Sequence, residues 1–498
     1  MKNTPPLKIM FIASEAAPYA KSGGLGDVVG ALPLFLQKMK LDVRIALPNY
    51  SGVSEKAEKL SGKKVEQLNI VPSVEMGING TSRFGVLRTC LPDSTVPVYL
   101  IDHQYYFNRK GLYGEIPDAE YGDNGERFLF FSKSVFSLCK EINFQPDIIH
   151  AHDWHTGPVA MFLNHYRTYD SFFKSTKSLF TIHNMQYQGN FPAETFSLTG
   201  LGNHSFSEQN GEHFGSFNFL KSGIRNASRV NTVSEGYARE ICTPQFGYGL
   251  DRELLLRGNT FSGIRNGIDS QEWDPEHDKL IPFNFDSANL AGKANNKTAL
   301  QKKFNLPVDP KIPLFGIVTR LAEQKGIDVL ASALPEMLKW EMQFVLLGTG
   351  ESWAEKYFPV LADRMPEKCS VKIGYDEPTA HLIEAGCDFY IMPSRFEPCG
   401  LNQMYSLRYG TVPIVRATGG LDDSVENFNE AQGTGTGFKF TDLTKDALIN
   451  TVGWALYTWY NAFEEYSAMQ KRGMALDNSW PNSAAKYLQL YRAALEDV

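Results

Sequence analysis

Short apolar runs that alternate with helical stretches constrain the fold of this chain more than any other feature. Such runs, rich in β-branched and aromatic residues, are typical of buried strands. They form two series, at 9–13, 43–47, 98–101, 147–150, 179–183 and 230–233, then at 314–319, 344–347, 371–373, 389–392 and 412–415. Strands that alternate with helices build parallel sheets with helical crossovers. The sequence therefore predicts an α/β protein with two Rossmann-like, doubly wound domains.

The length of 498 residues also favours two domains, because one hydrophobic core seldom supports so long a chain. We expect a first domain at 1–261 and a second at 262–476. The last segment, 477–498, has an amphipathic period and is expected to pack back on the first domain. Helices are predicted between the strands, among them 126–141, 326–338, 380–385 and 401–409.

Composition excludes several classes of function. The net charge of −7 argues against general nucleic-acid binding, which needs a basic surface. No run approaches the 18 or so apolar residues of a membrane span, so no membrane partner is expected. Six cysteines are scattered without CxxC spacing and are expected to be reduced thiols. The start of the chain lacks a leader-like segment, which predicts a cytoplasmic protein or a chain that has already been trimmed.

The most informative motif is Lys21-Ser22-Gly23-Gly24-Leu25-Gly26-Asp27, which lies between the first strand and a helix that we expect to open at Val28. Bare amide groups and the positive end of a helix dipole attract anions. Lys21 adds a mobile positive charge suited to phosphate. The motif therefore predicts a ligand that carries phosphate.

The loop is open to two other interpretations. Gly24, Gly26 and Gly30 come close to a dinucleotide fingerprint. However, residues 14–22 separate them from the strand, and no acidic residue ends a second strand at the expected offset. A glycine turn with a purely structural role is the other alternative.

Unusual polar residues recur where predicted strands end, as ligand sites do in open α/β sheets. They include the segments 150–155, 181–184, 319–326, 393–401 and 417–420. Because both halves of the chain show this pattern, we expect both domains to present loops to one inter-domain cleft.

Two cations and one carboxylate are the main candidates for ligand binding in the second half of the chain. Arg320 and Lys325 together suit a diphosphate, although a pair of surface cations is the plain alternative. Glu397 suits the paired hydroxyls of a sugar or ribose; otherwise it satisfies a helix dipole. The turn Gly419-Gly420 offers amide groups to phosphate, and Cys399 is expected to pack as a small apolar residue.

Histidines at 150, 152 and 155, with Asp153, invite a metal interpretation. His150 and His152 would share one face of a strand, but His155 lies beyond the bend. A polar lining for a sugar pocket fits these residues better than a metal site. No Asp-x-Asp stretch is present to chelate a metal–diphosphate complex, so no metal and no other cofactor are expected.

Several long motifs occur in one order along nearly the whole chain. They include Lys-Ser-Gly-Gly-Leu near the start and the segments 121–128, 152–155, 183–189, 244–249, 265–269 and 397–401. In this pattern the chain resembles glycogen synthases of the bacterial type and the plant starch synthases. The resemblance implies the GT-B fold and transfer of glucose from ADP-glucose to the non-reducing end of an α-1,4-glucan such as glycogen, with retention of configuration.

The resemblance also implies roles for individual residues. Arg320 and Lys325 would stabilise the departing ADP, Glu397 would bind glucose hydroxyls, and His183 would lie at the reacting centre. The donor would be held by a larger set: Lys21, Gly23, Gly24, Asp27, Asp153, Asn266, Tyr375, Cys399, Gly400, Leu401, Thr418, Gly419 and Gly420. Among these, Lys21 would hold the diphosphate and Tyr375 would stack on the adenine.

Many related retaining enzymes carry a second glutamate eight positions after the Glu397 type, where this chain has Tyr405. With no obvious nucleophile in the motifs, we favour attack on the face that the leaving group vacates. Two other classes of function were considered: a scaffold that binds glucan without catalysis, and a phosphorylase, which would need a lysine for pyridoxal phosphate.

Overall fold

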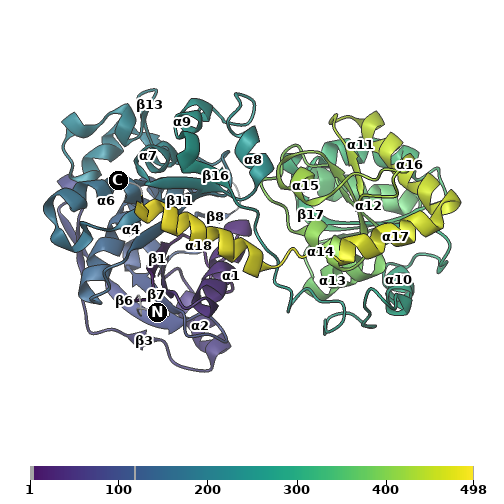
Figure 1. The fold of residues 1–498 in the computed structure, drawn as a ribbon, viewed down its shortest axis with the longest axis horizontal. Helices are drawn as coiled ribbons and strands as arrows, with labels where there is room; N and C mark the ends of the chain where they lie inside the picture. The colour runs from purple at the N-terminus through teal and green to yellow at the C-terminus, as the bar shows by residue number, and fades with distance from the viewer. Residues whose placement is uncertain (1–4, 117–118, 497–498) are drawn as a thin grey trace. The chain divides into compact units, whose positions relative to one another are not determined.

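The computed structural model describes residues 5–116 and 119–496. It divides the chain into two compact units, which are described separately (Figure 1). The first unit comprises Met1–Val233, Ala238–Asn266 and Trp480–Val498. The second comprises Ser234–Tyr237 and Gly267–Ser479. Helix α8 (Glu235–Glu240) thus begins in the second unit and ends in the first.

The first unit is built on a sheet of nine strands in the order β16-β15-β11-β10-β1-β2-β7-β6-β3. The strands from β16 to β7 run parallel, while β6 and β3 add an antiparallel edge. Their bounds are β1 Lys8–Ile12, β2 Asp42–Pro48, β3 Glu66–Gln67, β6 Gly85–Cys90, β7 Pro97–Asp102, β10 Ile148–His152, β11 Lys177–Ile182, β15 Arg229–Thr232 and β16 Phe261–Gly263.

Helices join these strands, and three small antiparallel sheets lie in the connections. The helices are α1 Gly24–Lys38, α2 Val53–Ser61, α3 Gln104–Phe107, α4 Asn124–Glu141, α5 Asp153–Thr156, α6 Pro158–Tyr169, α7 Phe219–Asn226, α9 Asp251–Leu255 and α18 Trp480–Glu496. The small sheets pair β4 (Ser73–Glu75) with β5 (Thr81–Arg83), β8 (Gly114–Ile116) with β9 (Ala119–Glu120), and β12 (Asn190–Pro192) and β13 (Glu212–His213) with β14 (Ser216–Asn218).

The last helix, α18, packs within the first unit although it follows the second in sequence (Figure 1). Its hydroxyl groups reach buried polar residues at the strands: Tyr491 Oη lies 2.9 Å from His150 Nδ1, and Asn231 Nδ2 donates to Tyr487 Oη at 3.2 Å. Both tyrosines are fully buried. The apolar period of the segment and these polar contacts together hold α18 against the sheet.

The second unit contains one parallel sheet of six strands in the order β19-β18-β17-β20-β21-β22. The strands are β17 Leu314–Leu321, β18 Gln343–Gly350, β19 Cys369–Ile373, β20 Phe389–Met392, β21 Val412–Arg416 and β22 Phe438–Phe440. Its helices are α10 Ala291–Lys303, α11 Ile327–Met337, α12 Ser352–Arg364, α13 Glu377–Gly386, α14 Asn402–Arg408, α15 Gly419–Ser424, α16 Lys445–Asn461 and α17 Phe463–Met474.

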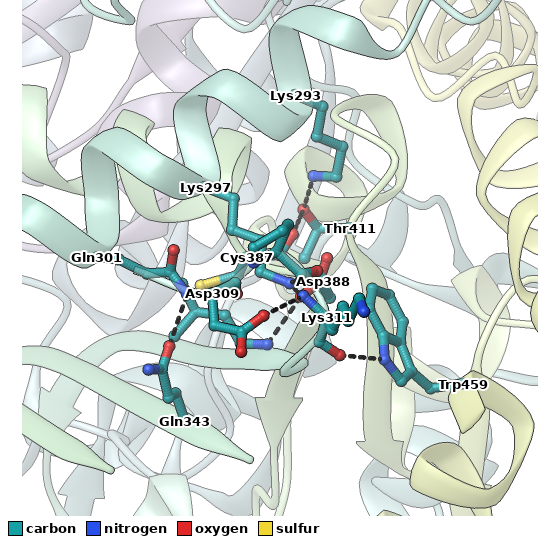
Figure 2. A network of polar contacts seen from close by, with 12 residues as sticks. Lys293, Lys297, Gln301, Asp309, Lys311, Gln343, Cys387, Asp388, Thr411 and Trp459 are labelled. Atoms are coloured by element: carbon teal, nitrogen blue, oxygen red, sulfur yellow. Dashed lines mark hydrogen bonds and ion pairs between the residues drawn. The ribbon is translucent and has the colours of Figure 1, made fainter. Parts of the chain in front are cut away.

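A buried polar network ties α10 to this second sheet (Figure 2). Lys297 Nζ forms an ion pair with Asp388 at 2.7 Å, and Lys293 Nζ donates to Thr411 Oγ1 at 2.6 Å. Burial lowers the pKa of Lys293 to about 8. Each charged head is matched by a carboxylate or a hydroxyl, as buried charges require.

Every predicted strand coincides with an observed strand, so the two predicted series of parallel strands are confirmed. Two helices begin distinctly earlier than predicted. Helix α1 begins at Gly24, not at Val28, because the glycines themselves form its first turn, and α13 begins at Glu377, not at residue 380. The antiparallel edge and the small sheets were not predicted, since their strands are short and largely exposed. Among the described residues, no helix is both long and apolar enough to span a membrane.

Candidate active site

In the first unit, four buried histidines gather where β10 ends and just beyond β11. His150 and His152 lie on β10, His155 lies in α5, and His183 directly follows β11. The pairing of His152 with Thr181 in register brings the two strand ends together. As a result His152 Nδ1 lies 3.0 Å from His183 Nε2. This contact orients the His183 ring and occupies one of its nitrogens.

Both ring nitrogens of His150 have protein partners, so this histidine does not suit a metal. Its Nδ1 lies within hydrogen-bond distance of the Tyr491 hydroxyl, and its Nε2 lies 2.6 Å from Thr181 Oγ1. The Thr181 hydroxyl in turn donates to Asn231 Oδ1 at 2.6 Å. Both ring nitrogens are therefore engaged. Within residues 5–116 and 119–496, neither possible metal-holding group includes any of these four histidines.

Asp153 lies at a sharp turn between β10 and α5. Its backbone φ is +54°, in the left-handed region that is unusual for a residue other than glycine. Its Oδ1 accepts the backbone amides of His183 at 2.6 Å and of Asn184 at 3.4 Å. The carboxylate thus anchors the segment that carries His183, a positioning role that the sequence did not reveal.

Burial lowers the pKa of all four histidines, and that of His183 to about 3. An unfolded histidine takes up its proton near pH 6.5. The unfolded state therefore binds more protons between these values, and the free energy of unfolding must fall as the pH drops from about 6.5 towards 3. Asp153, whose pKa burial raises to about 7, acts in the opposite direction.

This linkage predicts a specific change in the variant His183→Asn. Between about pH 6 and pH 4, its free energy of unfolding should depend less steeply on pH, by about 1.4 kcal/mol per pH unit. Urea denaturation of both proteins at several pH values measures the two slopes. Because Asp153 and the other histidines are common to both, equal slopes would show that His183 is not buried in its neutral form.

The glycine-rich loop contains an internal anion that was not predicted. The buried carboxylate of Glu15 accepts the amides of Ser22 at 2.6 Å and Gly23 at 3.1 Å, the Ser22 hydroxyl at 2.6 Å and the Tyr113 hydroxyl at 2.7 Å. The expectation that these amides are bare was therefore wrong for Gly23. Lys21 forms an ion pair with Asp27 at 2.6 Å, and both side chains remain partly exposed.

The Glu15 contacts predict that this carboxylate stabilises the loop. Glu15→Gln should lower the free energy of unfolding by about 1–3 kcal/mol, because several charge-assisted hydrogen bonds are weakened in a buried place. Urea denaturation measures the change. Glu141→Gln, an exposed position at the end of α4, is the matched control and should stay within about 0.5 kcal/mol of the parent. Equal stability of the two variants would contradict the anchoring role.

In the second unit, Lys325 and Glu397 form a close pair at the ends of β17 and β20. Lys325 Nζ lies 2.6 Å from Glu397 Oε2, and the two residues are 72 positions apart in sequence. The side chain of Glu397 is only 7% exposed, and Ser394 Oγ also donates to it, at 3.2 Å. These two contacts fix the Glu397 side chain in place.

Arg320 lies on β17 and its side chain is exposed. Its guanidinium group has no hydrogen-bond or ion-pair partner among the residues that the structure describes. A planar cation of this kind matches the oxygens of a phosphate group.

In the turn Gly419-Gly420, which was predicted to bind phosphate, the amide of the second glycine makes a hydrogen bond within the protein. The Gly420 amide donates to the carbonyl of Glu397 at 2.9 Å, so it is not available to a phosphate. A Cβ at Gly420 would lie 2.0 Å from the Cys399 carbonyl oxygen, which explains why glycine is needed there. Gly420 therefore supports the loop of Glu397 and Cys399, and its predicted direct contact with phosphate is corrected.

The remaining predicted residues differ in their exposure and in the contacts that they make. Tyr375 is 70% exposed on the loop before α13, as an aromatic platform would be. Asn266 is buried, and its Oδ1 finds no partner among the described residues. Gly400 has a φ of +67° and lies against Gln403. Cys399 is buried, as expected of an apolar packing residue, and Leu401 caps α14.

Tyr405, which replaces the second carboxylate of many related enzymes, has a structural partner. Its ring stacks on Trp273 with centroids 3.8 Å apart and planes at 8°. The segment therefore supplies packing at this position where a second carboxylate would otherwise stand.

Comparison with known proteins agrees with these features. Residues 8–255 match the family model described as starch synthase catalytic domain, and residues 296–473 match glycosyl transferases group 1. The chain is 46% identical to glycogen synthase 1 of Geobacter metallireducens over 98% of this chain and 96% of that protein. It is 42% identical to the glycogen synthase of Treponema denticola, over 98% and 99%.

Among solved structures, the catalytic domain of starch synthase IV from Arabidopsis thaliana, bound to ADP and acarbose, matches with a TM-score of 0.87 and 32% identity over 98% of this chain and 99% of that one. Two parallel-sheet domains and these matches define a glycosyltransferase of the GT-B fold. The chain belongs to the glycogen and starch synthase family.

Proposed function

We propose that this glycogen synthase family member uses ADP-glucose as donor, and that it extends the non-reducing end of an α-1,4-glucan with retention of configuration. The observation that carries the proposal is the fixed Lys325–Glu397 pair with Arg320 on the same strand end. A related starch synthase has been solved with ADP and acarbose, which supports an adenine nucleotide and a glucan-like ligand. A cytoplasmic location remains a prediction.

The proposed roles follow from charge and burial. Arg320 and Lys325 stabilise the negative charge that develops on the departing ADP. Glu397 accepts hydrogen bonds from glucose hydroxyls with its remaining acceptor capacity. In the first unit, Lys21 holds the donor diphosphate, and neutral His183 offers a hydrogen bond at the reacting centre without adding charge. Tyr375 stacks on the adenine, while Asn266, Thr418 and Gly419 complete the donor contacts.

The same contacts favour transfer without a covalent glycosyl intermediate. Glu397 is already held by Lys325 and Ser394, which lowers its nucleophilicity and directs it towards hydrogen bonding. The leaving diphosphate can then accept the proton of the acceptor hydroxyl while that hydroxyl forms the new glycosidic bond on the same face. Configuration is retained because the bond forms where the old one breaks.

Glucose incorporation into glycogen from ADP-glucose and from UDP-glucose, each with a chelator present, tests the proposed donor. We expect incorporation from ADP-glucose to exceed that from UDP-glucose and to be insensitive to the chelator. Lys21→Ala should lower kcat/KM for the donor at least tenfold, because a cation on phosphate is lost. Equal use of both donors would contradict the donor assignment, and binding of glucan without incorporation would favour a scaffold.

A further inference from the structure

A histidine that has no role in the proposed transfer has an unused nitrogen. His381 lies in α13, is 1% exposed, and its Nδ1 lies 2.8 Å from Asp278 Oδ2. Its Nε2 is buried and finds no hydrogen-bond partner among the described residues. Because a buried polar atom without a partner is costly, the arrangement calls for a ligand at this nitrogen.

The surroundings of Asp278 settle which ring nitrogen carries the proton. The Asp278 carboxylate also accepts the Tyr409 hydroxyl at 2.7 Å and the Leu280 amide at 2.7 Å. A carboxylate on which several donors converge acts as an acceptor, so His381 Nδ1 donates to it. In the tautomer with its proton on Nδ1, the ring presents a lone pair at Nε2. A histidine whose other nitrogen donates to a carboxylate is the usual arrangement of a metal ligand.

Two carboxylates complete the group. One oxygen of Glu272, one oxygen of Glu377 and a ring nitrogen of His381 all lie within 4.8 Å of one another. Since Nδ1 is engaged with Asp278, Nε2 is the nitrogen available to a metal. Glu377 lies one helical turn before His381 in α13, so both face the same side. Trp273, next to Glu272, stacks on the His381 ring with centroids 3.8 Å apart and planes at 16°, so it covers the face of the ring and not the in-plane direction of Nε2.

We propose that Glu272, Glu377 and His381 Nε2 form a site for a divalent transition metal of the Zn²⁺ class. Imidazole nitrogen and carboxylate oxygen are both ligands that Zn²⁺ binds in proteins. The dipole of α13 accounts for Glu377 at its first turn, but it does not account for the unpartnered buried nitrogen. The other candidate group, Asp274, Glu276 and His277, lacks such a nitrogen: His277 is exposed and its Nδ1 is already bound to Asp274.

The site would have a structural role. It joins the irregular segment that contains Glu272 to the start of α13, two residues after Tyr375. A bound ion would therefore fix the segment before α13 and raise the thermal stability of the folded chain, because a ligand that binds only the native state stabilises it.

Titration of the metal-stripped full chain with Zn²⁺, followed by calorimetry, tests the proposal. We expect one strong site per chain. Glu272→Gln, Glu377→Gln and His381→Asn should each weaken binding about tenfold or more. Asn at 381 keeps a donor for Asp278 and removes only Nε2. Glu276→Gln, in the same segment but in the other group, is the matched control and should bind as the parent does.

Thermal melting compares the Tm of each variant with and without Zn²⁺, so a folding defect in one variant does not decide the test. Zn²⁺ should raise the Tm of the parent and of Glu276→Gln, and should leave the Tm of the exposed-carboxylate variants Glu272→Gln and Glu377→Gln nearly unchanged. Absence of a strong site in the parent would overturn the proposal. So would binding that survives all three ligand variants, or binding that is lost in Glu276→Gln.

Discussion

Arg320→Ala should lower kcat by about 10²–10³ while the protein stays folded. Loss of one preorganised group at developing negative charge typically has an effect of this size. The side chain is exposed and makes no polar contact with the described residues, so its removal should change the free energy of unfolding by less than about 0.5 kcal/mol. Steady-state kinetics with ADP-glucose and urea denaturation measure the two effects separately.

Two further variants sharpen this test. Arg320→Lys keeps the charge but loses the planar pair of donors, so its kcat should lie between those of the parent and Arg320→Ala. Arg364→Ala removes another exposed arginine of the second unit, at the end of α12, and should leave kcat unchanged. Near-normal turnover of Arg320→Ala would remove this residue from stabilisation of the leaving group.

Lys325→Ala should lower both activity and stability, unlike Arg320→Ala. It removes a charge from the leaving group, which should reduce kcat by about 10²–10³. It also leaves the buried Glu397 without its ion-pair partner. Breaking a buried pair costs about 3 kcal/mol at the lower end of the usual range, which applies here because Ser394 still donates to the carboxylate.

The double variant Lys325→Ala/Glu397→Gln separates these effects. A neutral amide needs no cation, so the double variant should recover most of the lost free energy of unfolding and none of the lost kcat. Glu397→Gln alone measures what the carboxylate contributes when the lysine remains. If the double variant were as unstable as Lys325→Ala, the structural part of the pair would be refuted; if it recovered kcat, the catalytic part would be.

The strand pattern was predictable from sequence because parallel strands buried on both faces are continuous apolar runs. All strands at the centre of the two sheets follow this rule, as β10 and β17 illustrate. The edge strands β3 and β6 do not, because they are largely exposed and depend on pairing rather than on burial. The start of α1 was misplaced since glycines are poor helix formers, whereas here they occupy the first turn.

The candidate segments at strand ends were found by one physical rule, that ligand sites lie beyond the carboxyl ends of parallel strands. Single residues such as Tyr375 and Asn266 came instead from the resemblance to the family. That rule locates residues but not their partners. The contact between Lys325 and Glu397 spans 72 positions, and Glu15 reaches a loop whose path no local pattern specifies. A buried acid just after a strand, within a few residues of a glycine-rich loop, is the signal that would have suggested Glu15. For Gly420, the close approach of Cys399 became visible only in three dimensions.

The central claim is that this chain moves glucose from ADP-glucose to the non-reducing end of an α-1,4-glucan with retention. Proton NMR of a short maltooligosaccharide incubated with the enzyme and ¹³C-labelled ADP-glucose tests it most directly. We expect the label in a new terminal residue joined by an α-1,4 bond, in step with ADP release. A label found in a β-linked residue, or in free glucose alone, would contradict it.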